Sequence, residues 1–134
     1  RLRGGNLEQI TRDHSWLQEQ IDAGLITQQQ AAVSASRNLV TRALGVEELV
    51  LLEINEFEVR PDDLYLLCSD GLSEMVAHAE LAALLGARSS LEEKSQRLIE
   101  AANNHGGRDN ISVVLAKAST TPRKQGLMSR LLRV

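Results

Sequence analysis

The sequence predicts an α+β domain with antiparallel strands at its centre. A short, unbroken apolar run, Leu64–Cys68, is bracketed by polar turn formers, which is typical of a strand buried on both faces. A second strand is expected over Asn110–Lys117, after a glycine turn. Between the two runs the apolar residues recur at helical spacing, so helices are expected to connect the strands.

The first part of the chain predicts a hairpin and two short helices. Gly4-Gly5-Asn6 is typical of a hairpin turn. A hydroxyl residue followed by glutamine three positions later, the capping-box spacing, opens two expected helices, Ser15–Ala23 and Thr27–Val33. Because both are short and rich in glutamine, a mobile excursion is more plausible than a core element. His14 precedes the first helix, where a hydrogen-bonding role is more plausible than metal binding.

Two further strands are expected before the central run. Arg37–Gly45 ends at a glycine, and Leu49–Val59 is apolar, then alternating, and stops before a proline. Asp62-Asp63 forms the turn into the central strand. Cys68 is the lone cysteine and lies in the apolar run, so it is expected to be a small buried side chain. A disulfide framework and a thiolate metal site are therefore excluded.

After the central strand the pattern predicts three helical segments. Leu72–Val76 accounts for about one turn, and Glu80–Leu85 carries leucines on one face and ends before a glycine. Ser90 and Glu93 have the capping-box spacing and open a helix that runs to about Asn103. Its narrow apolar stripe predicts a helix that packs on a sheet.

Two aspartates stand at the ends of the central strands. Asp70 follows the run Leu64–Cys68, and Asp109 directly precedes Asn110–Lys117. If these strands are adjacent and antiparallel, both carboxylates lie at one rim of the sheet. Converging carboxylates without a cationic partner suit a hard divalent cation such as Mg²⁺ or Mn²⁺. The structural alternative is that the two aspartates only cap turns.

The overall composition excludes some classes of function. A chain of 134 residues fits one domain, and its net charge of −3 argues against a nucleic-acid binder. The only aromatic residues are Trp16, Phe57 and Tyr65, which do not suffice for a base-stacking platform. No apolar run approaches the roughly 20 residues of a membrane span, so a cytoplasmic location is expected. Because the chain begins at Arg1, it is expected to be a piece of a longer protein.

Four segments resemble, in order, the signatures of one family, the metal-dependent (PPM, type 2C) protein serine/threonine phosphatases. Asp62–Leu72 is similar to a late signature of the family, and Gly107–Val114 to its final signature. Thr11–Ser15 and Arg37–Gly45 resemble the segments that flank the flap in bacterial members. Any one match alone is weak, since Ser-Asp-Gly and Asp-Asn are common turn sequences, but the ordered set covers roughly residues 1–118.

The resemblance implies part of an α-β-β-α sandwich, in which two packed antiparallel sheets carry helices outside. Residues 1–118 would form the C-terminal half of the catalytic domain, with the flap at about 13–36, and residues 119–134 a basic, flexible tail. It also implies a centre of two Mn²⁺ or Mg²⁺ ions and up to a third, with Asp70 and Asp109 as ligands. No catalytic residue beyond these ligands and no other cofactor is expected in this chain.

The implied activity is hydrolysis of phosphoserine and phosphothreonine in proteins by a metal-activated water. The substrates would be phosphoproteins made by a cognate serine/threonine kinase. The family's bridging aspartate and its phosphate-binding arginine belong to an N-terminal half that this chain does not match, so the chain alone is expected to be inactive and marginally stable. The alternative is a pseudophosphatase that binds phosphoproteins without hydrolysing them.

Overall fold

The computed structural model describes residues 1–34, 36, 39–42, 45, 49 and 52–119. In chain order the described elements are β1 (Leu2–Arg3), β2 (Asn6–Leu7), α1 (Trp16–Asp22), α2 (Gln28–Ala32), β3 (Leu64–Cys68), α3 (Asp70–Ser73), α4 (His78–Gly86), α5 (Leu91–Asn104) and β4 (Val113–Lys117). The chain divides into a first unit, residues 1–8 and 58 onward, and a second unit, residues 9–57.

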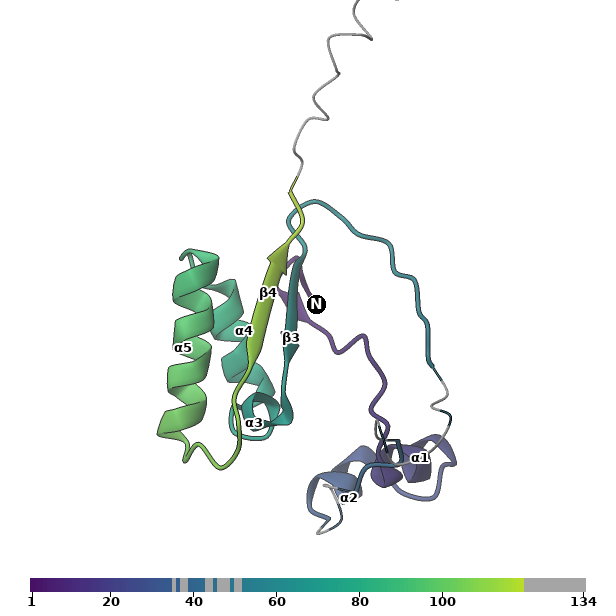
Figure 1. The fold of residues 1–134 in the computed structure, drawn as a ribbon. Coiled ribbons are helices and arrows are strands. Elements are labelled where there is room, and N and C mark those ends of the chain that lie inside the picture. The colour runs from purple at the N-terminus through teal and green to yellow at the C-terminus, as the bar shows by residue number, and fades with distance from the viewer. Residues whose placement is uncertain (35, 37–38, 43–44, 46–48, 50–51, 120–134) are drawn as a thin grey trace, which may run out of the picture. The chain divides into compact units, whose positions relative to one another are not determined.

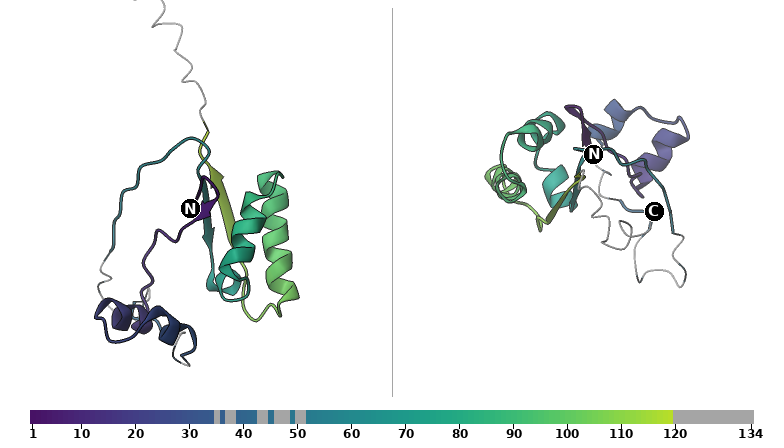
Figure 2. Two further views of the ribbon diagram at one scale, coloured as in Figure 1. Left: turned by 180° about the vertical axis from the view of Figure 1, so that it is seen from behind. Right: turned by 90° about the horizontal axis from the view of Figure 1, so that it is seen from above.

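The first unit is an antiparallel sheet with helices on one face. Its strand order is β2-β1-β3-β4, and β3 pairs with β4 from Leu64↔Lys117 to Cys68↔Val113. Helices α3, α4 and α5 lie together on the same side of β3 and β4 (Figures 1 and 2). The α+β class and the adjacent antiparallel strands are therefore confirmed, and this helix-covered sheet corresponds to one half of the expected sandwich.

The hairpin of β1 and β2 follows from its glycine pair. Gly4 and Gly5 have φ values of 55° and 84°, which a side chain would disfavour and which a two-residue hairpin turn requires. Leu2 pairs with Leu7 across the hairpin, and Leu2 also pairs with Leu64 of β3. The predicted turn is confirmed, and it places a short strand beside the central one.

The core of the first unit lies between the sheet and its helices. It consists of the buried side chains Leu64, Leu72, Val76, Leu81, Leu85, Leu98 and Ala102. Leu98 and Ala102 belong to the apolar stripe predicted for α5, and Ser90 and Glu93 form the predicted capping box at its start. The stripe and the cap together fix which face of α5 meets the sheet.

The prediction that β3 is buried on both faces is wrong. Side chains alternate between the faces of a strand, and the described helices of the first unit, α3, α4 and α5, lie on one face of this sheet. On the other face, Leu67 is 60% exposed and its cross-strand neighbour Val114 is 61% exposed. An unbroken apolar run shows which side chains a strand could bury, but it does not show whether another segment covers them.

Cys68 is also exposed, which corrects the expectation of a small buried side chain. It is the last residue of β3. Partial desolvation raises the pKa of the Cys68 thiol, and the negative charge of Asp70 raises it further. The thiol therefore stays protonated at neutral pH, so it is a poor metal ligand and a poor nucleophile.

A buried lysine caps the C-terminal end of α4 by donating hydrogen bonds to its last carbonyl groups. Lys94 of α5 is only 7% exposed, and its Nζ donates hydrogen bonds to the carbonyl oxygens of Leu85, at 2.8 Å, and of Ala87. These carbonyls belong to the last turn of α4 and the residue after it, where a cation is favourable. Desolvation lowers the pKa of Lys94, as do the nearby charges of Lys117 and Arg97.

The second unit contains α1 and α2, and both predicted helices are confirmed. The Ser15 hydroxyl accepts a hydrogen bond from the Gln18 amide at 3.2 Å, and Thr27 with Gln30 forms a complete capping box. The strand predicted over Arg37–Gly45 falls partly outside the described residues. Its described part forms an isolated antiparallel bridge between Val40 and Ser15.

The strand predicted over Leu49–Val59 is wrong in its described part. Residues 52–59 form no strand ladder, and Ile54 is 83% exposed. An alternating pattern permits a strand, but a strand also needs a partner to pair its backbone groups. The flexible tail predicted over 119–134 lies, apart from Ser119, outside the described residues. No helix in the described part of the chain is long and apolar enough to cross a membrane.

Candidate functional site

The two aspartates lie at the same end of the sheet. Asp70 is the first residue of α3, one residue after β3 ends, and Asp109 lies in the loop that leads into β4. The antiparallel ladder of β3 and β4 stops at the pair Cys68↔Val113, where β3 ends and β4 begins. Both aspartates therefore lie at the same rim of the sheet. The predicted juxtaposition of the two segments is confirmed.

Hydrogen bonds from Ser69 hold these two segments together. The Ser69 amide donates to the carbonyl oxygen of Ser112 at 3.1 Å. Its hydroxyl donates to the carbonyl oxygen of Asn110 at 2.7 Å and accepts from the Ser112 amide at 2.9 Å. The residue before Asp70 is thus bonded to the residue after Asp109.

Gly71 allows the two backbones to approach closely. It is buried, and a Cβ atom placed on it would lie 2.4 Å from the Asn110 carbonyl oxygen and 3.3 Å from the carbonyl carbon of Asp109. No side chain fits at that distance, so glycine is required by the space rather than by φ. Backbone contact at Gly71 therefore sets how near α3 comes to the Asp109 loop.

Each carboxylate is engaged by its neighbouring amide and is otherwise open. Asp70 Oδ1 accepts from the Gly71 amide at 2.9 Å, and Asp109 Oδ1 accepts from the Asn110 amide at 2.6 Å. Both aspartates are exposed. Among the described residues, nothing forms an ion pair with either carboxylate, and neither Oδ2 atom has a hydrogen-bond donor. One oxygen of each carboxylate is thus available to a ligand.

The donor chemistry at this rim fits Mn²⁺ or Mg²⁺ but is incomplete. Carboxylate oxygens are the ligands that these cations prefer. Within the ranges that the structure describes, no group of three or more histidine, cysteine or acidic side chains could hold a metal ion. Asp70 and Asp109 can therefore contribute part of a coordination sphere, and water or other protein groups must complete it.

Two histidines, one in each unit, make structural contacts. His14, in the second unit, has its Nε2 2.9 Å from a Glu53 oxygen, which agrees with the expected hydrogen-bonding role. His105 caps α5, and its Nδ1 lies 3.0 Å from the carbonyl oxygen of Met75. His105 thereby ties the start of the Asp109 loop to the segment after α3.

The sequence reasoning missed the role of Ser69 and the contact of Gly71 with Asn110. Both residues lie in the Ser-Asp-Gly stretch that was singled out for its aspartate. What requires the glycine is the neighbouring backbone of Asn110 rather than a positive φ. The serine could have been suspected from its position, since a hydroxyl just before a helix commonly bonds to the backbone.

Comparison with known proteins identifies the family. The family model for stage II sporulation protein E (SpoIIE) matches residues 10–119. This chain belongs to the SpoIIE family of PPM-type phosphatase domains. The serine/threonine phosphatase stp of Listeria welshimeri is 39% identical over 116 residues, which is 87% of this chain and 46% of that protein. The protein phosphatase PhpP of Streptococcus pneumoniae is 32% identical over 85% of this chain and 46% of its own length.

Solved PPM-type structures resemble this chain in fold. The serine/threonine phosphatase PstP/Ppp of Mycobacterium tuberculosis is 41% identical with a TM-score of 0.82, covering 88% of this chain and 49% of that structure. A structure of the PstP catalytic domain in complex with two manganese ions is 40% identical, with a TM-score of 0.71 over 88% of this chain and 48% of that one. The chain spans about half the length of the curated relatives it matches.

Proposed function

We propose that the protein containing this chain is a metal-dependent protein serine/threonine phosphatase, with Asp70 and Asp109 as ligands of Mn²⁺ or Mg²⁺. The observation that carries the proposal is the shared position of the two aspartates, each with an uncommitted carboxylate oxygen, at one rim of the sheet. The manganese complex of the related PstP domain supports the choice of metal. Its substrates would be cytoplasmic phosphoproteins made by a cognate kinase.

The chain's own contribution is to hold two negative charges in a fixed arrangement. Ser69 and Gly71 fix α3 against the Asp109 loop, and the local amide bonds orient each carboxylate. When bound, divalent cations supply Lewis-acid activation of water and neutralise charge on the phosphoryl group. Because Asp70 and Asp109 form only part of a coordination sphere, we expect this chain alone to be inactive.

The test is hydrolysis of p-nitrophenyl phosphate and of phosphoserine peptides by the full-length protein with Mn²⁺. Asp70→Asn and Asp109→Asn should each lower the rate about 100-fold or more, since each removes a charged ligand at nearly unchanged shape. Asp62→Asn is the matched control, because Asp62 is an exposed aspartate just before the start of β3, whereas Asp70 follows the end of that strand. Full activity in either ligand variant would contradict the assignment.

Titration of the same proteins with Mn²⁺ separates the remaining alternatives. Aspartates that only cap turns would show no saturable Mn²⁺ binding that depends on Asp70 or Asp109. A pseudophosphatase would bind phosphopeptides without hydrolysing them, even with Mn²⁺ present. Saturable binding that both variants weaken, together with hydrolysis, is the result expected for the phosphatase.

A further inference from the structure

Ser69 occupies the point where β3 and β4 stop pairing. The last ladder pair is Cys68↔Val113, so Ser69 and Ser112 would form the next one. One of the two backbone hydrogen bonds of that pair is present, because the Ser69 amide donates to the Ser112 carbonyl oxygen at 3.1 Å. In a regular antiparallel pair, the Ser112 amide would donate in return to the Ser69 carbonyl oxygen.

The Ser69 carbonyl oxygen is instead used to begin α3. It accepts a hydrogen bond from the Leu72 amide at 3.1 Å. The Ser69 hydroxyl replaces this carbonyl as the acceptor for the Ser112 amide, at 2.9 Å. The same hydroxyl donates to the Asn110 carbonyl oxygen at 2.7 Å. One side chain thus lets the chain turn into a helix without releasing the neighbouring strand.

This replacement matters because of what flanks it. Asp70 directly follows Ser69, and Asp109 directly precedes Asn110. The hydrogen bond from the Ser69 hydroxyl to the Asn110 carbonyl oxygen therefore joins the immediate neighbours of the two aspartates. Without the hydroxyl, the Asn110 carbonyl and the Ser112 amide lose their partner, and the Asp109 loop is held at this end by the Ser69 amide and by contact with Gly71.

We propose that Ser69 is a positioning residue that fixes Asp109 relative to Asp70 and so sets the affinity of this rim for a divalent cation. The proposal rests on the proposed function, which supplies the two aspartates as ligands. Residues that orient metal ligands without touching the metal commonly change metal affinity about 10- to 100-fold when they are replaced. A loss towards the lower end is expected here, because the backbone contacts of Ser69 remain.

The test measures Mn²⁺ binding to the full-length protein by the electron paramagnetic resonance signal of free Mn²⁺. Ser69→Ala should weaken binding about 10-fold, and Ser69→Thr, which keeps the hydroxyl, should stay within about twofold of the unmodified protein. Ser73→Ala is the matched control. Ser73 is an exposed serine at the end of α3, and its hydroxyl makes only a long contact, 3.5 Å, with the Asp70 carbonyl oxygen.

A second readout uses the metal-free protein. Ser69→Ala should speed hydrogen exchange of the Ser112 amide, while the α5 amides exchange as before. Unchanged Mn²⁺ affinity in Ser69→Ala would overturn the role of Ser69 and leave the proposed function standing. A loss of Mn²⁺ affinity in Ser69→Thr equal to that in Ser69→Ala would have the same meaning. Absence of Mn²⁺ binding in the unmodified protein would overturn the proposed function, and the role of Ser69 with it.

Discussion

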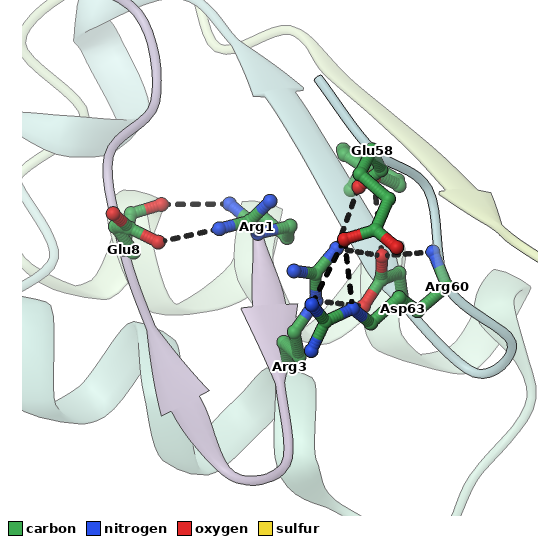
Figure 3. Close-up of polar contacts among 7 residues, drawn as sticks. Arg1, Arg3, Glu8, Glu58, Arg60 and Asp63 are labelled. Atoms are coloured by element: carbon green, nitrogen blue, oxygen red, sulfur yellow. Dashed lines mark hydrogen bonds and ion pairs between the residues drawn. The ribbon is translucent and has the colours of Figure 1, made fainter.

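Arg3 and Asp63 form a bidentate ion pair that joins β1 to the segment just before β3. Arg3 Nε lies 2.7 Å from Asp63 Oδ1, and Arg3 Nη2 lies 2.6 Å from Oδ2 (Figure 3). Asp63 is only 1% exposed, and it also accepts from the Arg60 amide and the Tyr65 hydroxyl. Because β1 and β3 share only the ladder pair Leu2↔Leu64 among the described residues, this ion pair adds a second connection between them.

Two arginines at the start of the chain, Arg1 and Arg3 of β1, bond to the residues that border the second unit, Glu8 and Glu58. Arg1 of the first unit pairs with Glu8 at 2.7 Å, just before the chain enters residues 9–57. Arg3 donates to the Glu58 carbonyl oxygen at 2.7 Å, where the chain returns (Figure 3). The network around β1 therefore anchors the two points of the first unit at which the chain leaves and re-enters it.

Replacing Asp63 should destabilise the protein. Asp63→Asn keeps the shape but leaves the Arg3 guanidinium without its charged partner, and breaking a buried pair in this way is costly. We expect the melting temperature of the full-length protein to fall by roughly 10 °C. The matched control is Asp62→Asn. Asp62 is exposed, pairs with Lys117 at the surface and has a φ of 68°, which asparagine tolerates. Equal melting temperatures for the two variants would contradict the role of the ion pair.

The contribution of Asp63 should depend on pH in a defined direction. The hydrogen bond from Arg3 is the main cause that holds the pKa of Asp63 well below its usual range. The unfolded carboxyl group titrates near pH 3.9, so the stabilisation is fully present above about that pH and is lost as the pH falls towards the folded pKa. The gap in melting temperature between the unmodified protein and Asp63→Asn should be constant from about pH 7 to 5 and narrow below about pH 4. Thermal melts across this range would contradict the assignment if the gap narrowed above pH 5.

Adding one methyl group at Gly71 should disturb the proposed metal site. In Gly71→Ala the new Cβ would lie 2.4 Å from the Asn110 carbonyl oxygen, so α3 or the Asp109 loop must move. We expect a lower melting temperature and Mn²⁺ affinity reduced about 10-fold. Gly86→Ala is the control, because nothing lies within 4 Å of its Cβ position at the end of α4. Its melting temperature should be unchanged or slightly higher, and its Mn²⁺ affinity unchanged.

Local patterns predicted much of the fold, because capping and turn formation depend on residues close in sequence. The capping boxes of α2 and α5 and the glycine turn of the hairpin were all predictable in this way. The pairing of β3 with β4 was a condition of the sequence argument, because three helices separate the two strands; the structure confirms that they pair. That pairing is what brought Asp70 and Asp109 to the same rim.

Features that depend on distant residues were not predictable. Arg3 and Asp63 are 60 positions apart, and nothing in the local sequence of either one indicates the other. Nothing in the local sequence of α5 shows that the long side chain of Lys94 reaches the last carbonyls of α4. The exposed state of Leu67 was missed for a similar reason, because a run of apolar residues does not reveal whether a second layer covers it.

The open face of the sheet gives a direct test of the sandwich architecture. If a second sheet packs on this face in the full-length protein, Leu67 becomes a core residue, and Leu67→Ala should lower the free energy of unfolding by about 2–4 kcal/mol. If the face stays as exposed as in this chain, the loss should stay within about 0.5 kcal/mol. Leu98→Ala calibrates the measurement, because Leu98 is fully buried against the helix-covered face. Urea unfolding of the three proteins gives the comparison, and a Leu67→Ala loss far below that of Leu98→Ala would contradict the second layer.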